Sequence, residues 1–232
     1  MSSVIDGIIA RLYSVDANDR VKAAGEIGEI GTETEAPLVL KIAYEDEAST
    51  VRQMAIQSFH EIMKRKSLEE IVRAARSHFD EYVRIYAISI LGQFDKVDLS
   101  EVIPDLLHEV NPRIKIATVK AVADLNYSEM APKLLELFPS PESPLLTQVI
   151  AEAFAIMKYK KSKDKIKQYY VSNLDNLSLE LKTAILFALS SFGDKSAKKS
   201  LKNDEIDNFF TIKIGNQHYR GRKNLLKALN SL

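Results

Sequence analysis

Two histidine-glutamate pairs are the side chains of this sequence best suited to holding a metal ion. They are His60-Glu61 and His108-Glu109. Imidazole nitrogen and carboxylate oxygen are ordinary ligands of zinc and iron, so two such pairs that meet in space would form a metal site. The sequence has no Cys, which excludes thiolate metal sites, cysteine nucleophiles and disulfide bonds.

A second candidate is a basic residue that recurs along the chain at near-constant spacing. Its positions are Arg20, Arg52, Arg84, Lys115 and Lys182. A regular row of cations could follow a phosphate backbone. Acidic residues lie a little upstream of these positions, at Asp16, Asp46, Asp80, Glu109 and Asp175. We therefore favour a structural ladder, in which charge-assisted hydrogen bonds tie each turn between helices to its neighbour.

Composition and hydropathy narrow the class of protein. The chain has 232 residues, of which 46% are hydrophobic and 28% charged, which predicts a folded core rather than disorder. The longest uncharged stretch, residues 183–193, is short of the roughly 18 residues that span a bilayer, and Asp6 interrupts the region where a signal peptide would be apolar. We expect a soluble, cytoplasmic protein without a membrane contact.

The elements that carry these residues follow a repeat. Six copies of one pattern place their second residue at positions 20, 52, 84, 115, 147 and 182. In each copy, places 1, 5, 8 or 9, and 12 are apolar, which predicts an α-helix with one buried face. A second amphipathic segment separates successive copies. Because a single helical hairpin cannot bury its own apolar face, the hairpins must stack into a solenoid.

The pattern Val-Arg-x-x-Ala-x-x-x-Leu-Gly-x-Ile-Gly is clearest in residues 19–31, 83–92 and 181–193. It resembles the HEAT-repeat family, in particular the short form named for phycobilin lyases, over residues 4–200. The resemblance implies an all-α, right-handed α-α superhelix of about six to seven hairpins, with the second helices lining the concave side. The fifth copy departs from the pattern, because Thr147 replaces the basic residue and no Gly follows Phe154.

The repeat ends near residue 202, so we expect a solenoid in residues 1–202 and a C-terminal cap or extension in residues 203–232. Residues 209–214 are β-prone, Gly215-Asn216 predicts a turn, and residues 223–232 predict a final helix. We expect this segment to cover the last apolar face, as terminal repeats require. A docking tail is the alternative.

Two kinds of HEAT-like enzyme offer a comparison. Deoxyhypusine hydroxylase holds iron with His-Glu pairs, but His60 and His108 are 48 residues apart, which is not a multiple of the repeat, so the pairs lie out of phase. HEAT-like alkylpurine DNA glycosylases use Trp and a cationic concave face, whereas this chain has no Trp and zero net charge. We therefore expect no catalytic residue, no metal and no cofactor.

The concave groove is where we expect a partner to bind. Places 3, 7 and 10 of the second helices should face it, because the apolar places face the core. The expected contacts are Gln53, Gln57, His60, Ile85, Ser89, Ile116, Lys120, Gln148, Glu152 and Phe187. This lining is small, mildly apolar and nearly uncharged, which suits a peptide or a protein helix better than nucleic acid.

The charge is distributed unevenly along the chain. Residues 1–157 carry 16 basic and 25 acidic side chains, whereas residues 158–232 carry 16 basic and 7 acidic ones. The candidate contacts of this basic end are Lys158, Lys160, Lys161, Lys165, Arg220, Arg222 and Lys223. Basic residues interleaved with Tyr can hold single-stranded nucleic acid. They can also attract an acidic protein or a second copy of the chain, or simply face solvent.

These observations predict a non-enzymatic HEAT-repeat scaffold or adaptor that binds a protein or peptide in its concave groove. Nucleic-acid binding through the basic C-terminal third is the alternative. A HEAT-like enzyme, either a DNA glycosylase or a metal-dependent hydroxylase, is a further alternative.

Overall fold

The computed structural model describes residues 2–203 and 206–232. It contains two compact units, Met1–Val102 and Ile103–Leu232, which are described separately. No helix in the described residues combines the length and the apolar character needed to cross a bilayer.

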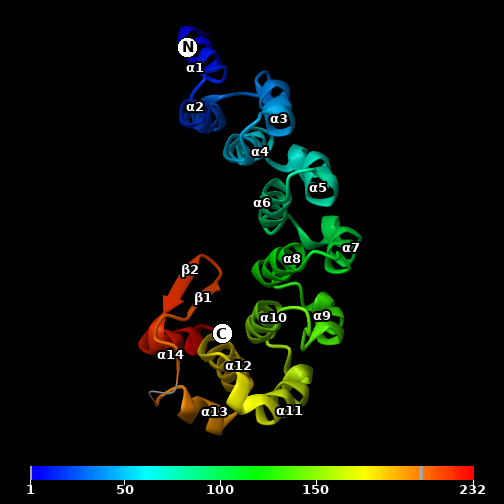
Figure 1. Cartoon of the computed structure of the whole chain (residues 1–232), viewed down its shortest axis with the longest axis vertical. Coiled ribbons are helices and arrows are strands. Elements are labelled where there is room, and N and C mark those ends of the chain that lie inside the picture. Colours follow the sequence, from blue (N-terminus) through cyan, green and yellow to red (C-terminus); the bar gives the residue numbers. More distant parts are fainter. Residues whose placement is uncertain (1, 204–205) are drawn as a thin grey trace. The chain divides into compact units, whose positions relative to one another are not determined.

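Unit 1 is built from helical hairpins packed against one another. Its elements are α1 (Ser2–Arg11), α2 (Ala17–Ile30), α3 (Ala36–Glu45), α4 (Ser49–Met63), η1 (Lys64–Ser67), α5 (Leu68–Ser77), α6 (Glu81–Leu91) and η2 (Lys96–Leu99). Helices α2, α4 and α6 pack side by side in one row, and α3 and α5 form the other row (Figure 1).

Unit 2 is built from helical hairpins of the same kind and also contains a β-hairpin. Its elements are α7 (Val102–Leu107), α8 (Pro112–Asp124), η3 (Ser128–Met130), α9 (Ala131–Leu137), α10 (Pro144–Ile156), η4 (Lys160–Ser162), α11 (Lys163–Asn173), η5 (Leu174–Asn176), α12 (Leu179–Ser191), α13 (Lys195–Ser200), β1 (Thr211–Ile214), β2 (Gln217–Arg220) and α14 (Gly221–Ser231). Helices α8, α10 and α12 form one row, and the hairpin lies on the side of this row away from α9 and α11 (Figure 1).

The core lies between the stacked hairpins. In α6, Val83, Ala87, Ile88 and Leu91 are fully buried, at the helical spacing that the repeat predicts. Five of the six row helices begin at polar N-caps, and α4, which follows Ala48, is the exception. The side chains of Asp16, Asp80, Asn111, Ser143 and Ser178 each accept a hydrogen bond from a backbone N–H in the first turn of α2, α6, α8, α10 and α12. The predicted all-α solenoid of HEAT-like hairpins is confirmed.

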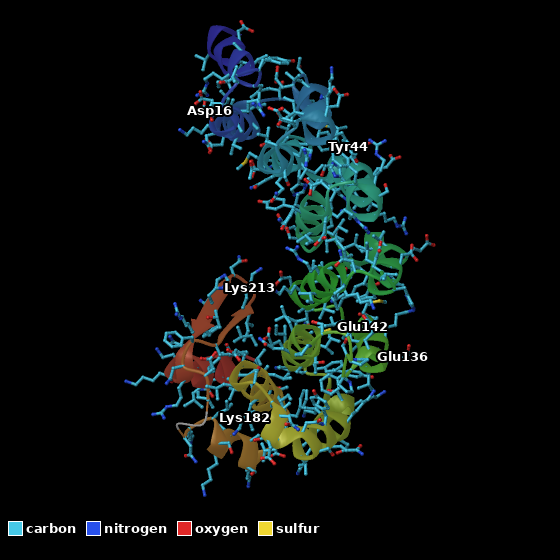
Figure 2. The ribbon with its side chains drawn as sticks, in the orientation of Figure 1. Asp16, Tyr44, Glu136, Glu142, Lys182 and Lys213 are labelled. Carbon is cyan, nitrogen blue, oxygen red and sulfur yellow. The ribbon has the colours of Figure 1, made fainter. Side chains whose placement is uncertain are left out.

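The recurring basic residues reach the turn of the next repeat. Arg20 forms a two-pronged ion pair with Asp46, at 2.8 and 3.0 Å. Arg52 pairs with Asp80, but both its Nε and Nη2 atoms contact the single oxygen Oδ2, because Oδ1 accepts from the backbone N–H of Tyr82. In unit 2, Lys115 bonds Glu142 at 3.0 Å, in the turn before α10 (Figure 2). Each basic side chain therefore bonds the acid that precedes the following copy of the repeat.

Two further copies bond backbone groups at this place of the repeat. Arg84 donates from its Nε atom to the carbonyl of Ala75 at 2.9 Å. In the fifth copy, the Thr147 hydroxyl accepts from the backbone N–H of Ser140 at 2.9 Å and lies 3.3 Å from its carbonyl oxygen. A short hydroxyl thus replaces the long cation, because here the turn approaches the helix closely enough for a direct bond to the backbone.

The C-terminal segment folds as a strand, a turn, a strand and a helix. Strands β1 and β2 are antiparallel, with Ile212 opposite Tyr219 and Lys213 opposite His218. Gly215 in the turn has φ +56°, a value that favours glycine. The strand and turn lie where the sequence predicts them, and α14 begins two residues before the predicted helix. The division at residue 202 into a solenoid and a cap stays a prediction.

A hydrogen bond connects this segment to α12, and several of its apolar side chains are buried. The backbone N–H of Asp207 donates to the Thr183 hydroxyl of α12 at 2.8 Å. Phe210, Ile212, Leu225 and Ala228 are buried. Because these apolar side chains come from the hairpin and from α14, the segment contributes its own part of the core of unit 2.

Candidate functional site

A cleft in unit 2 lies between the hairpin and the two helices that face it. Its volume is about 260 Å³. It is lined by Lys120, Ala123 and Asp124 of α8, Val149, Glu152, Ala153 and Ile156 of α10, Thr211, Ile212 and Lys213 of β1, and His218 of β2. The α10 positions are spaced three and four residues apart, which puts them on one face of the helix.

Glu152 is the half-buried carboxyl of this cleft. Gln148, one turn earlier in α10, donates from Nε2 to Glu152 Oε1 at 2.9 Å. Burial raises the pKa of Glu152 to about 7, although the Gln148 hydrogen bond and the charge of Lys120 act in the opposite direction. The carboxyl therefore exchanges its proton near neutral pH.

Positive groups surround the mouth of the cleft. Lys213 bonds Asp124 of α8 at 3.0 Å, and this pair joins the hairpin to the helix row (Figure 2). Lys120 is exposed and forms no ion pair among the described residues. His218, opposite Lys213 across the hairpin, is exposed as well.

These groups can bind a small polar molecule and move a proton. The apolar side chains of Val149, Ile156 and Ile212 lower the local polarity of part of the cleft, which strengthens polar interactions inside it. A carboxyl with a pKa near the working pH can act as a general acid or base. A positive rim beside it can hold a negatively charged group in place.

The corresponding face of unit 1 carries neutral polar side chains. On α4, Gln57 donates from Nε2 to Glu61 Oε1 at 2.6 Å and accepts a hydrogen bond from the Tyr86 hydroxyl of α6. Gln53 bonds Ser49 at 3.1 Å. Ser89 of α6 is exposed. Burial raises the pKa of Tyr86, and the charge of Glu61 adds to this rise.

His60 lies at the end of this face, in a second cavity of about 250 Å³ with Gln93, Phe94 and Asp95 of the following hairpin. Its Nδ1 atom is 2.8 Å from the Ser67 hydroxyl, and its ring centroid is 5.2 Å from that of Phe94. Burial lowers the pKa of His60, and the charge of Lys64 lowers it further. The ring therefore favours its neutral form.

Comparison with known proteins identifies the repeats. Residues 68–155 match the family model described as HEAT repeats. The chain is a HEAT-repeat protein. The comparison with curated proteins finds no match. Among solved structures, this HEAT-repeat protein is similar to the complex of CpcE and CpcF of phycocyanin lyase from Nostoc sp. PCC7120, with a TM-score of 0.57 and 18% sequence identity over 98% of this chain and 87% of that chain.

The structural match corrects one prediction. We expected a non-enzymatic protein because the His-Glu pairs lie out of phase with the repeat and the chain has no Trp and zero net charge. That prediction is wrong, because the matching structure is that of a lyase and has the same fold. A HEAT-repeat solenoid therefore does not argue against catalysis, and the cleft of unit 2 is the place where this chain brings ionisable groups together.

The two His-Glu pairs lie in different units. His60 and Glu61 belong to unit 1, whereas His108 and Glu109 belong to unit 2. His108 Nδ1 is 2.7 Å from the carbonyl oxygen of Pro104 in its own helix. Within residues 2–203 and 206–232, no group of three or more His, Asp or Glu side chains has a geometry that could hold a metal ion.

The predicted groove residues have different surroundings in the structure. Lys120 and Glu152 line the cleft, while Gln148 supports Glu152. Gln53, Gln57, His60, Ile85 and Ile116 are half-buried, and Ser89 is exposed. Phe187 is fully buried, which is a correction. It lies one helical turn after Thr183, which bonds the C-terminal segment, so this face of α12 is covered and Phe187 belongs to the core.

The predicted basic end is divided between two parts of unit 2. Lys158, Lys160, Lys161 and Lys165 lie at η4 and α11, whereas Arg220, Arg222 and Lys223 lie at β2 and α14. Figure 1 shows α11 and α14 on different sides of α12. Lys165 donates to the carbonyl of Leu135 at 2.8 Å, and the Arg220 guanidinium lies 5.3 Å from the ring centroid of Phe209. A contact through these residues stays a prediction.

The cleft contains groups that sequence reasoning did not combine. Asp124, Lys213 and His218 were not predicted as site residues, although Lys213 falls in the predicted strand. One sequence signal could have pointed to this cleft. Lys120 and Glu152 occupy the same place in successive copies of the repeat, so they lie on adjacent row helices as a cation and an acid.

Proposed function

We propose that this HEAT-repeat protein is a scaffold that binds a protein partner on the α2-α4-α6 face of unit 1. The observation that carries the proposal is the contrast between equivalent faces of the two units. In unit 2, the chain's own hairpin packs on the α8-α10 row and buries Ile212 there. In unit 1, Gln53, Gln57 and Ile85 are partly exposed. Gln57 is a neutral amide at the repeat place that holds Lys120 and Glu152 in unit 2.

The hairpin of unit 2 shows how a peptide segment can bind to a row of these helices. It supplies one buried aliphatic side chain, Ile212, and one ion pair, Lys213–Asp124. A partner segment on unit 1 would meet amide side chains instead. Because amides both donate and accept, they can bond an exposed peptide backbone without requiring a charged partner.

The solved structure similar to this chain adds a second kind of support. It is a complex of two proteins, CpcE and CpcF. We therefore propose that the partner is itself a protein, and a second HEAT-repeat chain is one form that it can take.

A site-specific cross-link tests the proposal. A photoreactive phenylalanine analogue at Ser89 of α6 should cross-link to the partner, whereas the same group at Ser77 of α5 should not, because α5 belongs to the other row. Both serines are exposed, which makes them a matched pair. With the partner then purified, Ser89→Arg should weaken binding by about tenfold or more, and Ser77→Arg should leave it unchanged. Equal effects at the two positions would reject the proposed face.

We infer a second candidate function, a lyase reaction in the cleft of unit 2. Glu152 supports this candidate, because its pKa of about 7 suits a group that gives and takes a proton, and the matching structure is a lyase. Positioned beside Lys120 and His218, the carboxyl can protonate a leaving group while a cation stabilises negative charge on the substrate.

Phycocyanin is the substrate to try first, because it is named with the matching lyase. The assay follows the absorption spectrum of phycocyanin in the presence of the protein. We expect a spectral change with the wild-type protein, none with Glu152→Gln, and the full change with Glu136→Gln, an exposed glutamate on α9. An unaffected Glu152→Gln variant would exclude this residue, and no change with the wild type would exclude this substrate.

A further inference from the structure

The walls and the rim of the unit 2 cleft differ in chemistry. Five aliphatic side chains form the walls: Ala123, Val149, Ala153, Ile156 and Ile212. The rim is polar and carries Lys120, Lys213 and His218. A ligand that fits both parts has an apolar body and one charged end. At about 260 Å³, the cleft is smaller than the roughly 300 to 1,000 Å³ typical of sites for drug-sized molecules, so the ligand is small.

The charges of the rim determine whether the charged end of the ligand is negative or positive. Asp124 already neutralises Lys213 at 3.0 Å. Lys120 and His218 have no such partner within the described parts of the chain, so the rim offers an ammonium and an imidazole to a ligand. An anion would gain both contacts, whereas a cation would meet the positive charge of Lys120, which is unpaired among the described residues.

Glu152 does not cancel this preference. Its burial favours the neutral carboxylic acid, which carries a proton that it can donate. Gln148 already occupies Oε1. A protonated Glu152 can therefore donate a hydrogen bond to an oxygen of a bound anion rather than repel it.

The geometry points to a binding site for a small carboxylate with an aliphatic tail. The carboxylate end lies between Lys120 and His218, Glu152 donates a hydrogen bond to it, and the tail contacts Val149, Ile156 and Ile212. A phosphate ester fits less well, because its second charge would need further N–H donors, and Lys213 is already committed to Asp124.

This arrangement couples ligand binding to proton uptake. A negative charge beside Glu152 disfavours its ionised form, so binding near pH 7 should add protons to the protein. The groups that face Glu152 are Lys120 and Asp124 from α8, Lys213 and His218 from the hairpin, and Gln148 from its own helix. Of these, His218 carries an imidazole at the rim, so replacing it by Gln isolates the contribution of Glu152.

Calorimetric titration with hexanoate tests the site, with hexylammonium and 1-hexanol as probes that share its tail. We expect hexanoate to bind more tightly than either. Lys120→Gln should weaken hexanoate binding by about tenfold, whereas Lys198→Gln on α13 should not change it, because Lys198 is exposed and lies outside the cleft. Tighter binding of hexylammonium, or hexanoate binding that is indifferent to Lys120→Gln, overturns the proposal.

Proton uptake is measured at pH 7 from the binding enthalpy in two buffers that differ in ionisation enthalpy. With His218→Gln, we expect uptake of up to about half a proton per hexanoate. Adding Glu152→Gln should abolish this uptake while hexanoate still binds, since the amide can also donate a hydrogen bond. Uptake that persists in the double variant overturns the role of Glu152. These titrations need no protein partner, so their outcome is independent of partner binding by unit 1.

Discussion

Removing the guanidinium of Arg52 should be among the most destabilising single substitutions in unit 1. Its Nε atom is 3.2 Å from Asp80 Oδ2, and its NH1 atom donates to the carbonyls of Asp46 and Glu47 at 2.5 and 2.9 Å. The side chains of Arg52 and Asp80 are only 10% and 6% exposed. Arg52→Ala would therefore leave a buried carboxylate and two carbonyl groups without their donor.

The expected cost follows from this burial. Breaking a buried ion pair by removing one partner costs about 3 to 5 kcal/mol. Arg65–Asp95 provides a matched control in the same unit, because its atoms are 2.7 Å apart but its side chains are 70% and 69% exposed. Arg65→Ala should cost about 0 to 1 kcal/mol, since exposed pairs are weakened by solvent and by side-chain entropy.

Urea unfolding followed by circular dichroism measures both costs. A second variant tests the explanation: Arg52→Met combined with Asp80→Ser removes both charges, while Ser can still cap α6 as Asp80 does at the N–H of Tyr82. This double variant should recover at least half of the loss. If Arg52→Ala costs no more than Arg65→Ala, the ladder does not stabilise unit 1 as argued.

The same pair predicts a pH dependence. Burial alone would raise the pKa of Asp80, but hydrogen bonds from Ser49, from Arg52 and from the Tyr82 N–H outweigh it and lower the pKa. A carboxyl with a lowered pKa stabilises the fold above its unfolded pKa of about 3.9, and that contribution is lost as pH falls through the folded value. The stability difference between wild type and Arg52→Ala should therefore be constant above about pH 5 and shrink below about pH 4.

Three further predictions concern other contacts. Gly28→Ala would place a Cβ atom 2.7 Å from Ser58 Oγ, so it should lower the free energy of unfolding by about 1 to 3 kcal/mol, as measured with urea. Gly25→Ala makes only an ordinary contact at 3.5 Å and should raise the free energy of unfolding by up to about 1 kcal/mol. Shifts in the same direction for the two variants would contradict this reasoning. Because the pKa of Glu152 is raised in the folded state, the stability of the wild type should fall as pH rises from about 4.5 to above 7. Glu152→Gln should therefore be more stable than the wild type by up to about 3 kcal/mol at pH 8 but not at pH 4. A difference that does not change with pH would refute the burial of this carboxyl. Lys213→Ala should change the unfolding free energy by under about 1 kcal/mol, because the ion pair with Asp124 is partly exposed. It should nevertheless speed hydrogen exchange of the hairpin amides by up to about fivefold. Unchanged exchange would show that the ion pair does not hold the hairpin against α8.

The repeat architecture could be predicted because its cause is local. Apolar residues at helical spacing, such as Val83, Ala87 and Leu91, identify each buried face from a single segment. The bonding partners of the recurring cations follow the same period, since Arg20 and Arg52 meet acids 26 and 28 residues later. A pattern that repeats in the sequence repeats its contacts in space.

Contacts that occur once could not be predicted in this way. Thr147 broke the pattern, and its hydroxyl bonds the backbone of Ser140, a group that every residue carries and that no sequence signal marks. The cleft depends on Lys213 and Asp124, which are 89 residues apart. The strand that carries Lys213 was predictable from local preference, but its position against α8 results from the burial of Ile212 and from the bond between Asp207 and Thr183.

One repeat place links the two proposed binding surfaces. The seventh place of the row helices holds Gln57 and Ser89 in unit 1 and Lys120 and Glu152 in unit 2. In unit 2 these positions hold ionisable side chains and the hairpin forms a wall beside them, which restricts access and favours a small ion. In unit 1 they hold neutral side chains, and Gln57 already bonds Glu61 and Tyr86, so a partner backbone can join an existing hydrogen-bond network. The same backbone position thus supports two kinds of recognition, because the charge of its side chain and the cover above it differ between the units.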